Sequence, residues 1–378
     1  MRITFTGDIM IEQPQLEATG QNFDAIFEPI KDYFKKTDIL VGNLETPIAG
    51  KESGYTAHKW SFNTPETLLD TLKAVGFSIL STANNHCLDR GYEGAIKTIE
   101  NIRRKGIKTI GTYANPDENH YLIEEVNGYK IAILSFTYGT NSVFNRQMLP
   151  DDKMWIVDLL SPQEKPNAAQ GKLSRYNIPL RLWRKVKTVF VSSSKNHPEI
   201  LVHQIDSAIS EARNAGADKI IFLSHMGGQY GTKPSVYSEM VVNHLLEKGV
   251  DYIVGNHEHT VQKSMRIDDK FVAYCLGNFA MSPNSDAATS DVLKKSNADV
   301  SILLHLDFLE ESTSPIISFQ VVKNVLDSHG ISRVYLLHDL IEKEESDDRK
   351  KALIKEYTQI ASRFSGRAIV SNSFEHLL

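Results

Sequence analysis

Short apolar runs alternate with amphipathic segments along the first 140 residues. The runs at residues 3–6, 38–42 and 77–81 are bounded by turn residues, which is typical of strands buried on both faces of a parallel sheet. Between the last two runs, apolar residues recur at the spacing of one face of a helix. This alternation predicts an α/β fold in which helices connect parallel strands.

Two of the connecting segments have residues that are typical of the start and end of a helix. In segment 64–76, the leucines and Val75 fall on one face, Thr64 is a candidate cap, and Gly76 suits the end. Segment 94–105 repeats this pattern with isoleucines on one face and three basic residues in its last turn. Both segments are predicted to be amphipathic helices.

The alternation resumes in the second half of the chain. We expect helices at residues 200–215 and 234–248, strands at 219–223, 251–254, 300–308 and 316–322, and hairpins at 122–136 and 265–276, turning at Asn127-Gly128 and Asp268-Asp269-Lys270.

The domain organisation follows from two stretches that break the pattern. Residues 141–198 are rich in Pro, Ser, Asn and Lys, and we interpret them as an insertion or lid. From residue 336 the chain is charged and helical, and we expect a peripheral element there. The sequence therefore predicts one domain at residues 1–330 and a C-terminal helical extension at 331–378.

Composition narrows the class of protein. The 378 residues include 41% hydrophobic and 24% charged residues, as in ordinary globular proteins. The net charge of −5 argues against a general binder of nucleic acid or anionic membranes. We expect no membrane span, because no apolar run approaches the roughly 20 residues required. With two distant cysteines, Cys87 and Cys275, and no secretory signal in the first residues, we expect a cytoplasmic protein.

Candidate metal-binding side chains follow the predicted strands. In an α/β sheet the carboxyl ends of parallel strands meet at one crevice, where ligands bind. Five strands deliver carboxylates, carboxamides or imidazoles there: Asp8; Asn43 and Glu45; Asn84, Asn85 and His86; His225; His257 and His259. Each alone has an ordinary explanation, since Asp caps helices, Asn favours turns and a buried His is often structural. Their joint occurrence predicts a cluster of oxygen and nitrogen ligands.

These residues resemble a known family. Gly7-Asp8, Asn43-Leu44-Glu45, Asn84-Asn85-His86 with Asp89, His225 with Tyr230, and Gly255 to His259 are similar to the CapA-type capsule-biosynthesis family, which is named for poly-gamma-glutamate synthesis and belongs to the calcineurin-like metallophosphoesterase superfamily. The resemblance covers roughly residues 2 to 325. It implies a four-layer α-β-β-α sandwich with the site at one edge.

The resemblance also implies roles for individual residues. It makes Asp8, Glu45, Asn85, His225, His257 and His259 the metal ligands, His86 the catalytic imidazole, and Asp89 the group that orients it. Asn43, Asn84, Lys59, Tyr230 and Asn278 are expected to contact substrate or support the ligands. One or two divalent ions are implied, and the imidazole and carboxylate donors suit Mn, Fe or Zn.

Three positions depart from the superfamily pattern and leave the activity open. Met10 stands where phosphoesterases have a His ligand, a loss that the CapA-type family shares. Glu258 replaces a Pro between the two histidines, and Gln229 replaces an acidic residue before Tyr230. The default hypothesis is hydrolysis of a phosphoester. A peptide-type or poly-gamma-glutamate substrate is the alternative, which could be cut, ligated or deprotonated at an alpha carbon, as in epimerisation. A third hypothesis is a non-catalytic polymer-binding component that works with other capsule-synthesis or export proteins.

Overall fold

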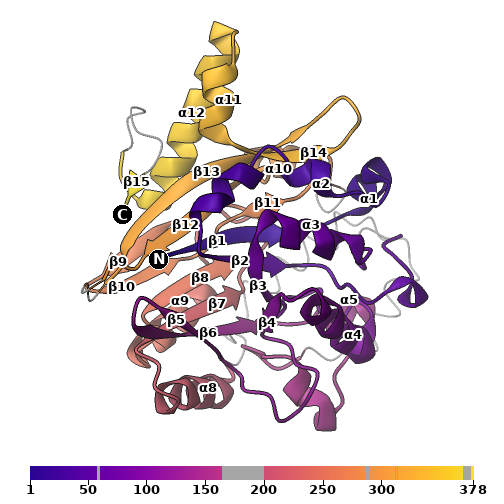
Figure 1. Cartoon of the computed structure of the whole chain (residues 1–378), viewed down its shortest axis with the longest axis vertical. Coiled ribbons are helices and arrows are strands. Elements are labelled where there is room, and N and C mark those ends of the chain that lie inside the picture. Colours follow the sequence, from indigo (N-terminus) through magenta and orange to yellow (C-terminus); the bar gives the residue numbers. More distant parts are fainter. Residues whose placement is uncertain (58–59, 164–199, 286–289, 311, 313, 369–375) are drawn as a thin grey trace.

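The computed structural model describes residues 1–378 except 58–59, 164–199, 286–289, 311, 313 and 369–375. Most of the predicted insertion, and with it the prediction of a lid, therefore lies outside the described residues. The strands form two sheets that lie face to face (Figure 1).

The first sheet contains, in spatial order, β14 (Ser332–Leu336), β13 (Ile316–Leu326), β12 (Val300–Asp307), β1 (Arg2–Ile9), β2 (Ile39–Leu44), β3 (Phe77–Ser81) and β4 (Lys108–Ile110), with β11 (Asn278–Ala280) paired to β1 and β15 (His376–Leu377) to β13. The second contains β5 (Leu122–Val126), β6 (Tyr129–Thr137), β7 (Lys219–His225), β8 (Tyr252–Asn256), β10 (Lys270–Ala273) and β9 (Ser264–Ile267). Strands β1 to β4 are mutually parallel, and so are β6 to β8.

Helices cover the outer faces of both sheets. Beside the first sheet lie α1 (Gln13–Thr19), α2 (Asp24–Phe27), the 3₁₀ helix η1 (Lys31–Lys36), α3 (Thr67–Val75) and α4 (Gly91–Arg104) (Figure 1). The others are η2 (Lys51–Ser53), α5 (Ser142–Asn145), η3 (Asp151–Ile156), α8 (Val202–Asn214), α9 (Val236–Glu247), α10 (Ser290–Ser296), α11 (Leu337–Lys343) and α12 (Asp347–Ser365). Among the described helices, none has the combined length and hydrophobicity that crossing a bilayer requires.

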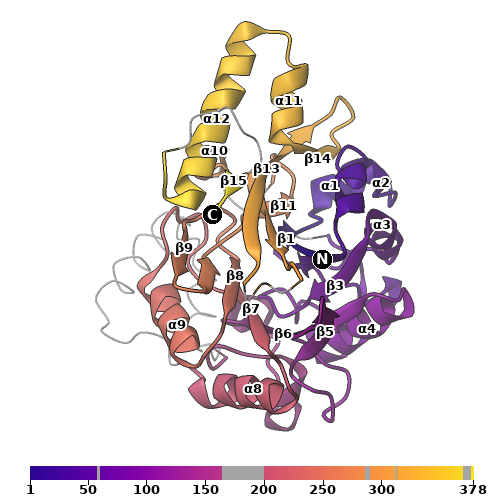
Figure 2. The same ribbon diagram turned by 60° about the vertical axis from the view of Figure 1, so that its left-hand side comes forward.

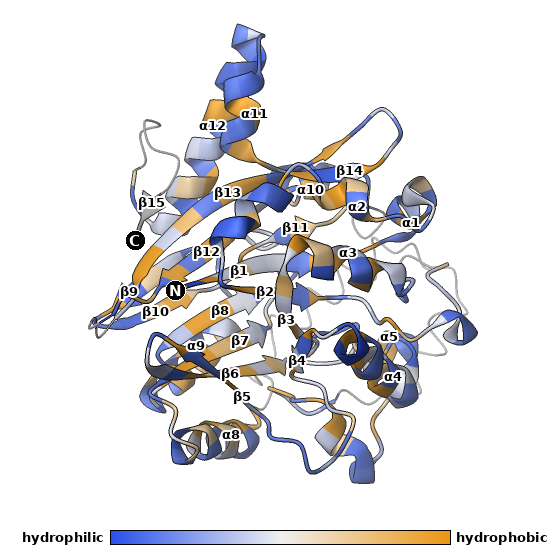
Figure 3. Ribbon diagram, in the orientation of Figure 1, coloured by the Kyte–Doolittle hydropathy of each residue, from blue (hydrophilic) through white to orange (hydrophobic). Residues whose placement is uncertain are grey.

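Side-chain alternation along the strands builds the layers. Successive residues of a strand point to opposite faces of its sheet. On β2, Val41 enters the central core between the sheets, whereas Leu40 packs toward α3. On β7, Ile221 enters the same central core, whereas Phe222 packs with α8 and α9. The hydropathy colouring shows these strands as predominantly apolar (Figure 3). The predicted four-layer α-β-β-α sandwich is therefore confirmed.

The predictions of turns and of a helix end are confirmed where Asn or Gly adopts a positive φ angle. Both hairpins turn where expected, and Asn127-Gly128 has the positive φ angles of the tight turn. Gly76 ends α3 in the left-handed region, at φ 113°. The cap at Thr64 is wrong, because α3 begins at Thr67 and the Thr64 hydroxyl instead bonds the Thr46 hydroxyl at 2.8 Å.

The tail belongs to the central core rather than the periphery. Residue 330 lies in the turn between β13 and β14, which are paired strands of one sheet. The last turns of α12 bury Tyr357, Ile360 and Phe364, and the Phe364 ring lies 5.0 Å from that of Phe319. Figure 2 shows the opposite end of α12, with α11, projecting beyond the sheets. The sequence missed this packing because the exposed turns of α12 make the segment read as polar.

Acid should weaken the fold through His305. Burial, together with Arg2, lowers the pKa of His305 to about 3, and its ring nitrogens contact the hydroxyls of Thr4 and Tyr33 at 3.0 and 2.9 Å. The unfolded chain then binds an extra proton between about pH 6.5 and 3. We expect the free energy of unfolding to fall by up to ~1.4 kcal/mol per pH unit across this window.

Urea titrations at pH 7.5 and 5.0, on the wild type and His305→Gln, test this prediction. The variant should lose less stability than the wild type on acidification. Equal losses in the two proteins would contradict it.

Candidate metal centre

The two sheets bring their polar strand ends to one edge. Asp8 lies opposite Asn43 on β2 and opposite Asn278 on β11, while His225 lies opposite Asn256 on β8. The prediction placed Asp8, Asn43 and His225 just past their strands, whereas the strand pairing continues through all three. The carboxyl ends still converge as expected.

A glycine permits the close approach that fixes Asp8. A Cβ on Gly7 would lie 2.0 Å from the carbonyl oxygen of Gly277. Without that atom, the Asp8 N–H donates to the same carbonyl at 2.9 Å. Gly7 therefore lets the chain from Gly277 pack directly against the end of β1 and holds the Asp8 backbone in place.

The loop after β8 presents two histidines from strained backbone. His257 and His259 have φ angles of 102° and 56°, which non-glycine residues rarely adopt. The His257 N–H donates to Asp8 Oδ2 at 3.2 Å, so the strained turn is tied to the first sheet. Strain of this kind costs of order 1–3 kcal/mol per residue and is typical of functional sites.

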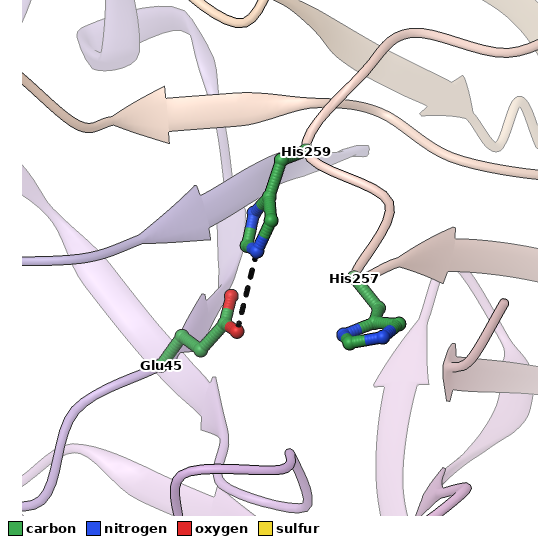
Figure 4. Close-up of side chains that lie close together, drawn as sticks. All are labelled: Glu45, His257 and His259. Carbon is green, nitrogen blue, oxygen red and sulfur yellow. Dashed lines mark ion pairs between the residues drawn. The ribbon is translucent and has the colours of Figure 1, made fainter. Parts of the chain in front are cut away.

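The candidate ligands contact one another. His225 Nε2 lies 2.6 Å from Asn85 Oδ1, 3.5 Å from Glu45 Oε1 and 3.1 Å from His257 Nδ1. His259 Nδ1 lies 3.4 Å from Asp8 Oδ2, and its Nε2 lies 3.9 Å from Glu45 Oε1 (Figure 4). The structure thus brings together all six residues expected to be ligands.

The donor set fits a divalent cation. Both carboxylate oxygens of Glu45 are buried and lack a hydrogen-bond partner. Two overlapping groups, Glu45-His257-His259 and Asp8-Glu45-His225, offer ligand atoms within 4.8 Å of one another. A buried carboxylate without a partner is costly unless it is paired or coordinates a metal. Carboxylate and imidazole together suit Mn, Fe or Zn.

The surroundings of His257 and Asp8 favour a neutral imidazole and an ionised carboxylate. Burial, reinforced by His225, lowers the pKa of His257 well below its ordinary value, so this imidazole is neutral and able to ligate. For Asp8 burial raises the pKa, but hydrogen bonding to His259 and nearby imidazoles outweigh it, so the net pKa is lowered. Asp8 is accordingly ionised.

His86 and Asp89 form a pair beside this cluster. His86 Nδ1 lies 2.7 Å from Asp89 Oδ2, an oxygen that also accepts the Phe62 N–H at 2.8 Å. Burial opposes the charge on His86, but Asp89 outweighs it and raises the His86 pKa. The Phe62 ring packs 4.4 Å from the imidazole. Asp89 therefore fixes the orientation of His86 and favours its protonated form.

Amide side chains hold the ligands in position. Asn43 Nδ2 donates to Asp8 Oδ1 at 2.7 Å, and Asn84 Nδ2 donates to the Leu44 carbonyl at 2.8 Å. Asn278 Oδ1 lies 2.8 Å from His259 Nδ1. The Tyr230 ring lies 5.6 Å from the His259 ring, while Lys59 lies outside the described residues.

The sequence model of "Bacterial capsule synthesis protein PGA_cap" matches residues 2–283. The chain belongs to this PGA_cap family. It is 26% identical over 284 residues to "Capsule biosynthesis protein CapA" of Bacillus anthracis, covering 74% of this chain and 59% of that protein. It is 25% identical over 322 residues to "PGA biosynthesis protein CapA" of Bacillus subtilis, covering 83% and 73%. The chain thus spans about three fifths of the length of the first relative.

Solved structures show more distant similarity. A hypothetical protein from Thermus thermophilus aligns with a TM-score of 0.44 and 14% identity, covering 85% of this chain and 99% of that one. The calcineurin-like phosphoesterase YfkN from Bacillus subtilis aligns with a TM-score of 0.42 and 15% identity, covering 95% and 96%.

The structure shows the surroundings of Met10 and Glu258, two positions that the sequence singled out. Met10 is buried among apolar side chains with Phe62 and Met281. Glu258 points toward Gly227, where an added Cβ would lie 1.9 Å from its Oε1. Burial raises the Glu258 pKa well above its usual range.

One residue near the PGA_cap-family site was missed. The Tyr138 ring lies 4.6 Å from the His257 ring. Tyr138 directly follows β6, so the rule that singled out the other strand ends could have found it. A tyrosine is nevertheless a weaker indicator of metal chemistry than a histidine or carboxylate, which is why the pattern did not single it out.

Proposed function

We propose that this protein is a metal-dependent hydrolase that acts on a phosphoester or on a peptide-type bond of a capsule polymer. The observation that carries the proposal is the buried Glu45 carboxylate, which has no hydrogen-bond partner and faces three histidines. Asp8, Asn85, His225, His257 and His259 complete the proposed donor set. Divalent ions, one or two in number, would supply Lewis-acid chemistry by lowering the pKa of water and neutralising charge on a substrate oxygen.

His86 is the proposed general acid. Its Nδ1 is held by Asp89, which leaves Nε2 to carry the proton delivered to a leaving group. The raised pKa of His86 supports this role, because its protonated form is favoured over that of a free imidazole. Asp89 is the positioning residue of the pair.

The substrate class and partners rest on family membership. The names of the two Bacillus relatives refer to biosynthesis of capsule and PGA, which supports an anionic polymer or a precursor of it as substrate. We propose other capsule-synthesis proteins as partners. A cytoplasmic location is part of the proposal, supported by the buried free thiols of Cys87 and Cys275.

Metal analysis combined with activity assays tests the proposal. Chelator-treated protein is reloaded separately with Mn²⁺, Fe²⁺ or Zn²⁺, and the bound ions are counted. Each form is assayed on phosphomonoesters, phosphodiesters and gamma-glutamyl peptides. We expect metal-dependent turnover that is lost in His225→Ala and His257→Ala, whereas metal-loaded protein inert on every substrate would refute the hydrolase.

His86→Asn should separate chemistry from metal binding. We expect kcat to fall about 10²–10⁴-fold, because the proton donor is lost, while KM changes little. Metal content should stay at the wild-type level. The exposed His329→Asn is the matched control and should leave both quantities unchanged. A His86→Asn enzyme with wild-type kcat would remove the imidazole from the mechanism.

A further inference from the structure

A cavity of about 310 Å³ lies between α8 and η3. It is separate from the metal centre, since its lining includes none of the residues assigned to that site. In both views α8 lies at the end of the molecule opposite α11 and α12 (Figures 1 and 2). Its volume is at the lower end of the range of small-molecule pockets.

The polar wall of the cavity is a fixed network. The carboxylate of Asp158, which is buried, accepts from the Tyr113 hydroxyl at 2.6 Å and contacts His120 Nδ1 at 2.5 Å. The Asp158 backbone is bonded to Gly111 and Thr137, so the carboxylate is held in place. With Nδ1 engaged, the other ring nitrogen of His120, Nε2, is the atom left for a ligand.

An opposite charge lies across the cavity on α8. Glu211 lines the same cavity, and its Oε1 accepts from the Ser207 hydroxyl at 2.8 Å. It is near enough to raise the pKa of both His120 and Asp158. For His120, hydrogen bonding to Asp158 is the largest cause of its raised pKa, which favours the imidazolium. Because the Asp158 carboxylate is already bonded to Tyr113 and His120, the cavity has one cationic contact point, His120, and one carboxylate left for a ligand, the exposed Glu211.

The remaining lining is mixed, with the exposed polar side chains of His203 and Gln204 on α8 beside an apolar part. Met154 and Trp155 from η3, Val157, and Ala208 from α8 face the cavity. The only groups of three metal-ligating side chains found among the described residues lie at the metal centre, so the chemistry here does not fit a bound cation. A ligand that matches this lining carries both charges and an apolar group.

We propose that this cavity binds a zwitterionic α-amino acid with an apolar side chain. The ligand carboxylate accepts from His120 Nε2, the ammonium group pairs with Glu211, and the side chain packs against Met154 and Val157. The bond to His120, which is anchored on the buried Asp158, is expected to contribute at least about a tenfold gain in affinity. The ion pair with Glu211, an exposed residue, is expected to contribute about a two- to fivefold gain.

Isothermal titration calorimetry of the full chain with L-leucine tests the proposal. We expect saturable binding, with L-leucinamide, which lacks the carboxylate, at least about tenfold weaker. N-acetyl-L-leucine, which lacks the ammonium group that pairs with the exposed Glu211, should be about two- to fivefold weaker. Binding equal for all three compounds, or no binding of L-leucine, would overturn the assignment.

Variants identify the site. Glu211→Gln should weaken L-leucine about two- to fivefold, because Glu211 is exposed, and leave N-acetyl-L-leucine unchanged, because only L-leucine has the ammonium group. Ala208→Trp should fill the cavity and abolish binding. Glu247→Gln, at an exposed position on α9, is the matched control. Wild-type affinity for L-leucine in both Glu211→Gln and Ala208→Trp would refute this site.

Discussion

Glu45→Gln is expected to abolish metal binding while making the metal-free protein more stable. The Glu45 carboxylate is buried and neither of its oxygens accepts a hydrogen bond. Its contacts with His225 and His259, at 3.5 and 3.9 Å, compensate only part of the desolvation of its charge, so in the absence of an ion this charge opposes folding. The neutral amide of the variant has nearly the same shape. We expect the chelated variant to be about 1–3 kcal/mol more stable than the chelated wild type.

Thermal unfolding with and without Mn²⁺ checks both parts of this expectation. An ion at 100 times its Kd stabilises the folded protein by about 2.7 kcal/mol, so the Tm of the wild type should rise on addition of Mn²⁺ and that of the variant should not. The exposed Glu345→Gln is the control and should behave as the wild type. A Glu45→Gln protein that still retains Mn²⁺ would exclude Glu45 as a ligand.

Gly255→Ala is expected to unfold the protein or cost at least about 3 kcal/mol. The added Cβ would lie 1.9 Å from the carbonyl oxygen of Tyr274, a backbone atom that cannot rotate away. The Gly255 carbonyl itself accepts from Leu276 N–H at 3.0 Å, so a shift here separates β8 from the chain that follows β10.

Gly228→Ala provides the matched comparison. Gly228 also lies close to the metal centre, but an added Cβ there meets nothing within 4 Å and its φ is not positive. We expect a change within about 0.5 kcal/mol. Urea unfolding of the two variants gives the difference, and equal midpoints would contradict the steric argument.

The sequence predicted the framework of the site because its strands obey simple rules. Buried parallel strands read as short apolar runs, and polar residues at their carboxyl ends must converge. Asp8, His225 and His259 can therefore be grouped from the sequence alone. The strand ends were placed too early, since a polar residue that still pairs in a sheet looks like the start of a loop.

Other features depended on tertiary packing that no local pattern reveals. The Asp158 network joins Tyr113 and His120, from the connection between β4 and β5, to Asp158, which follows η3, and each residue alone is ordinary in the sequence. The polar neighbours of His120 in particular indicate a solvated histidine, whereas its ring contacts the buried Asp158. The burial of Phe364 similarly follows from the position of α12 against β13 rather than from its own segment.

The proposed ligands of the candidate metal centre come from both sheets. Asp8 and Glu45 come from the first sheet and the three histidines from the second, and Asp8 and His257 are 249 residues apart in the chain. A bound cation would therefore link the two sheets and close a long loop of the chain, much as a disulfide does. Removing the ion should destabilise this edge of the two sheets first. Amide protons near Asp8 and His257 should then exchange with solvent sooner than those at the far end of the same strands.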